Sequence, residues 1–346
     1  MSGIAPIKFV AIGGGTGLAT LLKGLKPYLD PAAEPVTGQF GINPRISLTA
    51  IVTVTDDGKS SGRLRGEFSV LPPGDIRNCL VALAEEDHFI TRLFRHRFPG
   101  DGAIGGHSLG NLIILALNQM NGSFLKAIDQ AREILGIRAK VLPSTLDRVD
   151  LVAQVGNRLV RGQVAIKSQN APIRKLTISP PDARALDESV EAILDADLVT
   201  LGPGSLFTSV IANLLVRGIA NALVESKAKK IYICNAMTES DETDGFTAVN
   251  HVEQLLNYAP KLRLDYSLFN SAPISEEMLG RYAAEKALQL EAPEMTDKMR
   301  RESGAIEFIS LPLISESRAV RHAPEKLSEA IFDIYSQRIS AANERR

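Results

Sequence analysis

The stretch IKFVAIGGGTGLATLLKGL, residues 7–25, decides the fold of this chain. Its first part is an apolar run that does not alternate with polar residues, which is typical of a strand buried on both faces. A glycine-rich loop follows, and then leucines at helical spacing. This order presents backbone N–H groups to a phosphate. We therefore expect a phosphate compound to bind at Gly13, Gly14, Gly15, Thr16 and Gly17; the alternative is a plain tight turn.

The loop matches neither of two common phosphate-binding motifs. Whether Gly13 or Gly15 is taken as the first glycine of the dinucleotide pattern, the third position holds Leu18 or Thr20 instead of glycine. The Lys-Ser/Thr pair of a P-loop is missing as well. The second strand also lacks the usual lone acidic contact to a ribose. An oxidoreductase that uses a nicotinamide dinucleotide is therefore the weakest of the functions considered.

Short apolar runs alternate with helical patterns along most of the chain. This alternation predicts an α/β fold with three layers, a mostly parallel sheet and right-handed crossovers. Residues 150–178 break the rhythm with extended pieces joined by turns, which indicates an antiparallel hairpin insertion. The expected strands are 7–13, 47–54, 137–142, 197–201, 230–235, 264–269 and 306–311, and the expected helices are 17–27, 75–86, 108–120, 124–135, 183–195, 206–217, 247–258 and 325–340.

Composition narrows the class of protein. The chain has 346 residues, 45% of them hydrophobic, and a net charge of −1, so it lacks the basic field of a nonspecific nucleic-acid binder. Only two cysteines occur, which fits a reducing compartment. No signal peptide and no apolar run long enough to span a bilayer is visible. We expect a cytoplasmic protein without nucleic-acid partners or membrane spans.

Polar residues gather directly after the second expected strand, in TDDGKSSGRLR, residues 55–65. Carboxylates can hold Mg²⁺ or a ligand hydroxyl, and a guanidinium can pair with a phosphate through two hydrogen bonds. Because neighbouring side chains on an extended chain point in opposite directions, only one of the two aspartates is expected to face the ligand. The alternative is a solvated turn. The candidates are Asp56 and Asp57 as ligand or Mg²⁺ contacts, and Ser60, Ser61 and Arg63.

Two further segments place polar residues at the start of a helix. In PPGDIRN, Asp75 stands near an N-cap. Arg77 places a positive charge in the first turn, where the helix dipole disfavours it, and an anion bound nearby would offset this cost. In GGHSLGN, His107 is a candidate general base or phosphate contact, or simply a hydrogen-bonded loop residue. These segments add Asp75, Arg77, Asn78, His107, Ser108 and Asn111 to the candidate ligand contacts.

Two later strands also end in glycine or polar residues. GPGSLFTS, residues 202–209, is a second glycine loop between a strand and a helix, and NAMT, residues 235–238, follows the next strand. Ligands of open parallel sheets bind beyond the carboxyl ends of the strands. We therefore expect one extended site for a ligand with more than one phosphate, which includes Gly202, Gly204, Ser205, Asn235 and Thr238.

Taken in order, these segments resemble the CofD-like superfamily, and most closely its YvcK-like branch, the gluconeogenesis factors. The matching pieces are GGGTG, TDDGKSSGRLR, PPGDIRN, GHSLGN, GPGSLFTSV, YICNAMTESDETDGFTA and VRHAPEKLSEAI. The resemblance implies a single Rossmann-like CofD-like domain over residues 1–346, with its core at about 7–335, and assembly as a homodimer. Lys59 departs from the branch, which usually has glycine there, and residues 31–45 are longer than expected.

The resemblance implies two alternative functions. The YvcK-like branch resembles a regulator of cell shape and carbon flux that binds UDP-glucose or UDP-N-acetylglucosamine, needs no cofactor and has no established reaction. Its UDP-sugar contacts fall on Tyr282, whose ring can stack on uracil, and on Arg321, which can pair with the diphosphate. CofD enzymes instead use Mg²⁺ to transfer a phospholactyl group from a guanosine diphosphate-linked donor to a deazaflavin. We favour the regulator, with the transferase as the alternative.

Overall fold

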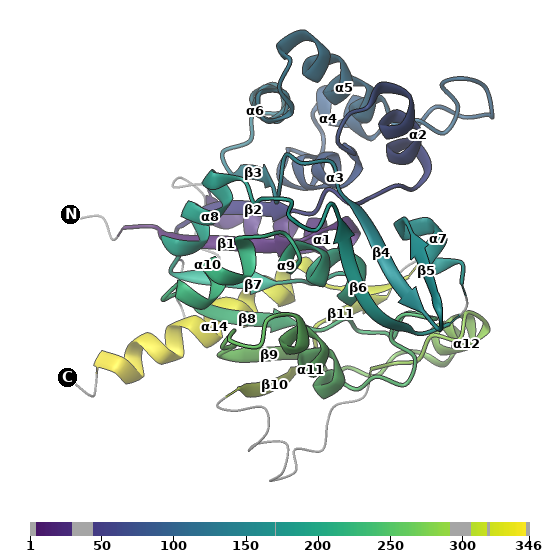
Figure 1. Ribbon diagram of the computed structural model, residues 1–346. Helices are drawn as coiled ribbons and strands as arrows, with labels where there is room; N and C mark the ends of the chain where they lie inside the picture. The colour runs from purple at the N-terminus through teal and green to yellow at the C-terminus, as the bar shows by residue number, and fades with distance from the viewer. Residues whose placement is uncertain (1–4, 30–43, 170, 291–305, 317–318, 344–346) are drawn as a thin grey trace.

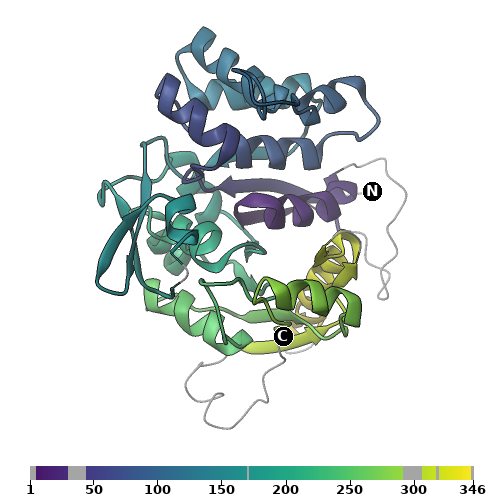
Figure 2. The ribbon, with the colours of Figure 1, turned by 90° about the vertical axis from the view of Figure 1, so that its right-hand side faces the viewer.

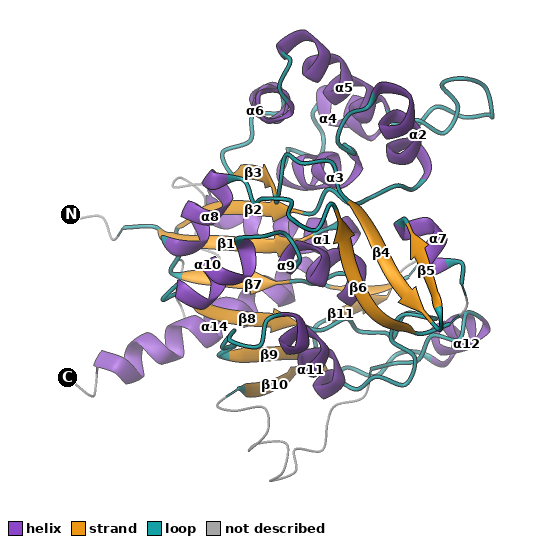
Figure 3. Cartoon of the chain, viewed as in Figure 1, coloured by secondary structure: helices purple, strands orange, loops and turns teal. Residues whose placement is uncertain are grey.

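The structure is a computed structural model, and it describes residues 5–29, 44–169, 171–290, 306–316 and 319–343. Most of the stretch 31–45, longer than the branch suggests, lies outside these ranges. The chain folds around a seven-stranded sheet in which every neighbouring pair of strands is parallel (Figures 1 and 3). The strand order is β10-β9-β8-β7-β1-β2-β3. The strands are β1 (Ile7–Gly13), β2 (Ile46–Val52), β3 (Lys140–Pro143), β7 (Leu198–Leu201), β8 (Lys229–Ile233), β9 (Tyr266–Asn270) and β10 (Glu307–Leu311).

Helices cover both faces of the sheet, so the predicted α/β architecture is confirmed. On one face, α1 (Gly15–Leu25) packs against α3 (Gly74–Leu83) and α14 (Pro324–Asn343). In Figure 2, the purple α1 and the yellow α14 lie together on the right of the sheet, and teal and green helices lie on the left. These helices on the other face are α8 (Asp187–Leu194), α9 (Ala212–Leu214), α10 (Ile219–Glu225) and α11 (Ala248–Tyr258), with a π-helical turn, η2 (Leu206–Ile211), before α9.

A group of helices is inserted between β2 and β3 and rises above the sheet in Figure 1. Two of its members were not predicted. One is α2 (Lys59–Phe68), which forms where we expected a polar loop; its buried Leu64 and Arg65 dock this otherwise hydrophilic segment. The other is the short α4 (Phe89–Arg95), whose Phe94 is fully buried. The remaining members, α3, α5 (Leu109–Asn121) and α6 (Phe124–Ile134), agree with the prediction.

The hairpin insertion exists, but its second expected extended piece, residues 159–166, is a strand only in its first half and a helix in its second half. The three-stranded antiparallel sheet has the order β5-β4-β6, formed by β4 (Asp150–Val155), β5 (Arg158–Arg161) and β6 (Ile173–Ser179). Gly162, with a φ of 95°, ends β5, and α7 (Gln163–Lys167) follows. We call residues 150–179 the flap. It lies where the main strands end, on the right in Figure 1.

Three further elements complete the C-terminal part of the chain. A further helix that was not predicted, α12 (Glu276–Ala284), follows β9. It is joined by the antiparallel pair β11 (Ile314–Glu316) and β12 (Val320–His322). Together with the short η1 (Lys26–Leu29) after α1, these elements complete the described chain.

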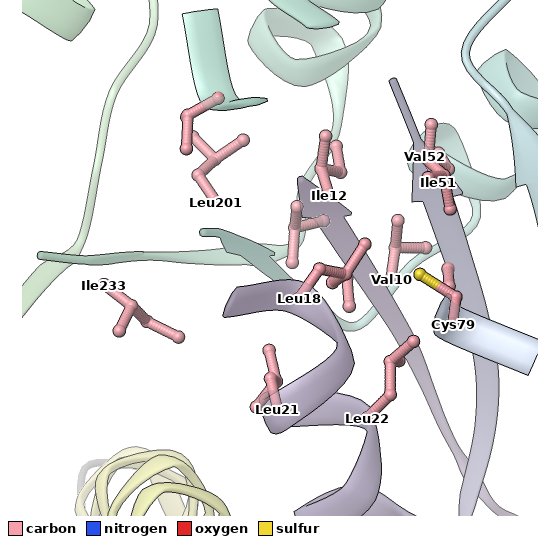
Figure 4. Close-up of a cluster of buried hydrophobic side chains, with 14 of the residues drawn as sticks. Val10, Ile12, Leu18, Leu21, Leu22, Ile51, Val52, Cys79, Leu201 and Ile233 are labelled. Carbon is pink, nitrogen blue, oxygen red and sulfur yellow. The ribbon is translucent and has the colours of Figure 1, made fainter. Parts of the chain in front are cut away.

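The core lies directly beneath the first glycine loop. Leu18 and Leu22 of α1 pack near Ile12 and Val52 of the sheet, and Cys79 of α3 lies beside them (Figure 4). All these side chains are fully buried. Both cysteines are free thiols inside the protein. None of the helices in the described ranges combines the length and the apolar character needed to cross a membrane.

Candidate functional site

The site lies at the point where the strand order reverses. From β1 the chain continues to β2 and β3 on one side, and β7, β8 and β9 occupy the other side. The loops after β1 and β7 therefore flank a crevice beyond the carboxyl ends of the strands, where ligands of such sheets bind. These are the two glycine loops of the sequence.

The two glycine loops touch each other through their backbones. A Cβ atom on Gly17 would lie 2.5 Å from the carbonyl oxygen of Pro203, and one on Gly14 would lie 2.6 Å from Cγ2 of Thr53. Only glycine allows these approaches. The N-cap residue of α1, Gly14, has no side chain to cap the helix, and Gly15, Thr16 and Gly17 of its first turn line the crevice.

A cavity of about 420 Å³ opens at this crevice. Its walls bring together segments that lie far apart in the sequence: both glycine loops, the ends of β2 and β8, the flap helix α7, and the C-terminal α12 and β12. Among the residues that the sequence predicted, the cavity is lined by Gly14, Gly15, Thr16, Gly17, Asp56, Asp75, Gly204, Ser205, Asn235, Thr238, Tyr282 and Arg321.

One of the two adjacent aspartates faces the cavity, as the alternation of side chains predicted. Asp56 lines it, whereas Asp57 points to the flap and accepts a hydrogen bond from the backbone N–H of Val164 at 2.9 Å. Asp57 was expected as a second Mg²⁺ ligand. In the structure it is Asp75, and not Asp57, that lines the cavity together with Asp56.

The charge of Asp56 acts on the Asp75 carboxyl. Burial, and next the charge of Asp56, raise the pKa of Asp75 to about 7, while a hydrogen bond from the backbone of Gly15 acts in the opposite direction. Two carboxylates that line one cavity suit Mg²⁺, which takes one or two carboxylates together with phosphate oxygens and water. Asp56 and Asp75 are therefore a donor set that would fit a magnesium ion.

A second group of predicted residues forms a polar network under α2 instead of lining the cavity. Ser60 Oγ lies 2.9 Å from Nδ1 of His107 and accepts a hydrogen bond from Asn111 Nδ2 at 3.0 Å. Arg77 Nε donates to Asn111 Oδ1 at 3.1 Å. Burial, and next the charge of Arg63, lower the pKa of His107. This network joins α2, α3 and α5.

Other predicted residues have structural roles or lie outside the lining. Arg63 donates to the carbonyl oxygens of Gly105 and Ala103, at 2.7 and 2.5 Å, and so holds a loop instead of facing the cavity. Ser61 Oγ accepts the backbone N–H of Gly74, and Ser108 caps α5. Gly13, Asn78 and Gly202 also lie outside the lining of the cavity.

Asn235 is held by its neighbours. Its Oδ1 accepts the backbone N–H of Gly204 at 3.2 Å, and its Nδ2 donates to Glu239 Oε1 at 2.8 Å. The second oxygen of Glu239 accepts from Ser205 Oγ at 2.6 Å. The Asn235 amide thus positions the second glycine loop, and Asn235 also lines the cavity.

Sequence reasoning missed several residues near the cavity, among them a lysine and its two carboxylate partners. Gln163 and Lys167 come from α7, in a stretch interpreted as a strand, and Lys167 Nζ lies 3.6 Å from Glu239 Oε2 and 3.2 Å from Glu242 Oε1. Burial, and next the charge of Glu239, raise the pKa of the Glu242 carboxyl to about 7. The only signal was the acidic run ESDE that follows NAMT.

Tyr282 and Arg321 reach the cavity from the C-terminal part of the chain. The Tyr282 hydroxyl accepts the backbone N–H of Val320 at 3.1 Å, which ties α12 to β12. In the part of the chain that the structure describes, no carboxylate lies within ion-pair distance of Arg321. Its guanidinium is an exposed cation at the cavity.

Known proteins match this chain over nearly its whole length. A family model described as 2-phospho-L-lactate transferase CofD matches residues 9–313. The chain belongs to the CofD family. Its relatives include the gluconeogenesis factors of Halalkalibacterium halodurans, 40% identical over 94% of this chain and 95% of the relative, and of Listeria innocua, 39% identical over 94% of both.

Solved structures agree with the membership in the CofD family. A crystal structure of a Bacillus halodurans protein superimposes with a TM-score of 0.86 at 38% identity and covers 95% of this chain and all of that one. A second structure from the same organism, described as a member of the UPF0052 family, gives a TM-score of 0.85. The mostly parallel sheet is therefore a shared feature of these proteins.

The unusual lysine of this CofD-family chain occupies a special backbone position. Lys59 has a φ of 43°, in the left-handed region that favours glycine. This conformation explains why a glycine would suit the position. The lysine side chain is exposed at the start of α2 and does not line the cavity.

Proposed function

We propose that this chain binds a nucleotide sugar, UDP-glucose or UDP-N-acetylglucosamine, and acts as a regulator. The observation that carries the proposal is the convergence of both glycine loops, Tyr282 and Arg321 on one cavity. Its volume of about 420 Å³ lies within the range of small-molecule sites, roughly 300–1,000 Å³. In this arrangement the first-turn amides of α1 and Arg321 hold the diphosphate, and the ring of Tyr282 stacks on uracil.

The cavity carries more negative than positive side chains, and part of this negative charge has to be neutralised before a diphosphate binds. Asp56, Asp75 and Glu239 oppose the two cations Lys167 and Arg321 along the walls. An anionic ligand therefore meets an excess of negative charge. A proton on Asp75, or Mg²⁺ held by Asp56 and Asp75, removes this repulsion. Mg²⁺ would supply charge neutralisation there, and no chemical step is required of it for the regulator.

Calorimetry with UDP-N-acetylglucosamine tests the proposal, with and without Mg²⁺. We expect measurable heat for the wild type and a loss of affinity of about tenfold or more for Arg321→Ala, because one charge-assisted contact is worth roughly 1.5–3 kcal/mol. Because Arg321 is exposed, the variant should keep the fold, which a thermal melt checks. No heat and no thermal shift at millimolar nucleotide sugar would overturn the proposal.

A second candidate is a CofD-type transferase that moves a phospholactyl group from a guanosine diphosphate-linked donor to a deazaflavin. The pair Asp56 and Asp75 beside the α1 N-terminus favours it, since Mg²⁺ on these carboxylates would neutralise the donor's phosphates. A tricyclic acceptor prefers aromatic walls, and among the described residues lining the cavity only Tyr282 and His322 carry an aromatic ring. Absence of product from purified donor, acceptor and Mg²⁺ would exclude the transferase.

We extend the proposal to the setting of the protein: a cytoplasmic homodimer that affects cell shape and carbon flux. The support is the resemblance to the YvcK-like branch and the two buried free thiols. Light scattering on the purified chain measures the oligomeric state. Growth and cell width of a deletion strain on gluconeogenic carbon sources, complemented with wild type or Arg321→Ala, test the regulatory role.

A further inference from the structure

The flap helix α7 forms one wall of the cavity. Gln163 and Lys167 stand four residues apart, on one side of the helix, and both line the cavity. Ile166 is buried, with an exposed fraction of 2%, and anchors the helix to the protein. The N-terminal turn is fixed to the end of β2 through the hydrogen bond from Val164 to Asp57. The helix thus connects the flap with the carboxylate segment of the site.

Separate contacts hold the base of the flap. Arg65 Nη2 lies 2.5 Å from Asp150 Oδ1 at the start of β4, and the backbone N–H of Leu176 in β6 donates to the Tyr258 hydroxyl at 2.7 Å. These contacts do not involve the cavity. A change at Lys167 therefore alters how α7 faces the site without removing the anchors of the flap.

The ammonium of Lys167 lies near two carboxylates, which differ in how many other polar partners they have. Glu239 already accepts hydrogen bonds from Ser205 and Asn235. Glu242 has only 2% of its side chain exposed, and within the described residues Lys167 is its one polar partner. Lys167 itself keeps 42% of its side chain exposed at the cavity. The cation is accessible to a ligand, whereas its partner Glu242 is not.

We propose that Lys167 is the contact of the flap to the anionic group of the ligand, and that this group displaces Glu242 as the partner of Lys167. The inference deepens the proposed function and rests on the same cavity. The anionic group then has three contacts: the amides at the N-terminus of α1, the guanidinium of Arg321, and the ammonium of Lys167, which the flap carries. Glu242 competes with the ligand for Lys167, so the Lys167–Glu242 ion pair lowers the affinity for anions.

A double-mutant cycle with inorganic pyrophosphate as the probe tests this exchange, measured by calorimetry on wild type, Lys167→Met, Glu242→Gln and the double variant. We expect Lys167→Met to weaken binding by about tenfold, the effect of one charge-assisted contact, and Glu242→Gln to tighten it by about threefold. In the Lys167→Met background, Glu242→Gln should change nothing, because the competition acts only through Lys167. Lys167→Met leaves the buried Glu242 carboxylate without its cation and could fail to fold for that reason. The double variant removes both charges, so its affinity for pyrophosphate can still be compared with that of Glu242→Gln.

Controls separate this exchange from general electrostatics. Glu253→Gln removes an exposed carboxylate of α11 that does not line the cavity and should leave binding unchanged. Lys167→Arg should keep most of the affinity. Equal tightening by Glu242→Gln with and without Lys167, or unchanged binding in both Lys167→Met proteins, would overturn the inference.

A parallel titration with UDP-N-acetylglucosamine distinguishes the two proposals. Binding of pyrophosphate with the expected cycle but not of the nucleotide sugar would overturn the proposed function and uphold the role of Lys167. Binding of both probes with no effect of Lys167 would do the reverse. Binding of neither would overturn both.

Discussion

Two features of its surroundings act on the pKa of Asp75 in opposite directions. It stands in the first turn of α3, where a helix favours a negative charge, and it shares the cavity with Asp56. Burial and Asp56 prevail and raise its pKa to about 7. At neutral pH the carboxyl therefore exists in both forms, and a cation or an anion in the cavity selects one of them.

The first prediction concerns the pH dependence of stability. Because the pKa of Asp75 is about 7 in the folded protein and near 4 in the unfolded chain, the folded state binds more protons between these values. The free energy of unfolding should then fall with rising pH in this window, by up to roughly 1.4 kcal/mol per pH unit from this group. Asp75→Asn should flatten the slope in urea titrations at pH 5 to 8. An identical slope in the variant would contradict the assignment.

The second prediction concerns Lys59. Replacing it with glycine should stabilise the protein, because a side chain in the left-handed region costs roughly 1–2 kcal/mol and the flexibility of glycine returns part of this. We expect a gain of about 0.5–1 kcal/mol in the free energy of unfolding by urea titration. Lys59→Ala keeps the Cβ atom and should not give this gain. A stabilisation of equal size in both variants would point away from the backbone.

At the scale of elements, local pattern predicts a segment well when its own residues decide its structure. The unit β1–glycine loop–α1 agrees with its prediction because leucines at helical spacing bury one face and glycines allow the close turn. The segments α2 and α7 were missed. Their regular structure depends on distant contacts, such as Arg65 with Asp150 and the N–H of Val164 with Asp57.

The third prediction tests the contact between the two glycine loops. Gly17→Ala places a Cβ atom 2.5 Å from the Pro203 oxygen and 2.8 Å from Gly204 Cα, so the loops must separate. We expect a loss of about 1–3 kcal/mol in stability and weaker binding of the nucleotide sugar. The matched control is Gly66→Ala in α2, where nothing lies within 4 Å of the added atom. Helix propensity should make that change neutral or stabilising by up to about 1 kcal/mol, and equal effects of both substitutions would contradict the packing argument.

At the scale of the whole molecule, the C-terminal region completes the site. Helix α14 packs on α1, and its Phe332 lies with its ring centroid 4.5 Å from that of Tyr28 and 6.1 Å from that of Phe9. Strand β12, which carries Arg321, directly precedes α14. The packing of the last helix therefore sets the position of a residue that lies more than 300 positions away from the first glycine loop in the chain.

The fourth prediction measures this packing. Phe332→Ala removes an aromatic side chain that is only 5% exposed and should lower the free energy of unfolding by about 3–5 kcal/mol. Met120→Ala, at a side chain 80% exposed on α5, serves as the control and should change it by less than about 0.5 kcal/mol. Urea denaturation of both variants provides the measurement. A loss below about 1 kcal/mol for Phe332→Ala would show that the last helix contributes little.

The sequence by itself determined the parallel sheet, the two glycine loops and the gathering of polar residues at strand ends, because these depend on local spacing and on burial along each strand. Only the tertiary structure decided which polar residues share the cavity. It paired Asp56 with Asp75 instead of Asp57, directed Arg63 and His107 into structural contacts, and added Lys167 from the flap. The direction and the partner of a side chain depend on elements that pack from elsewhere in the chain, and no local pattern encodes them.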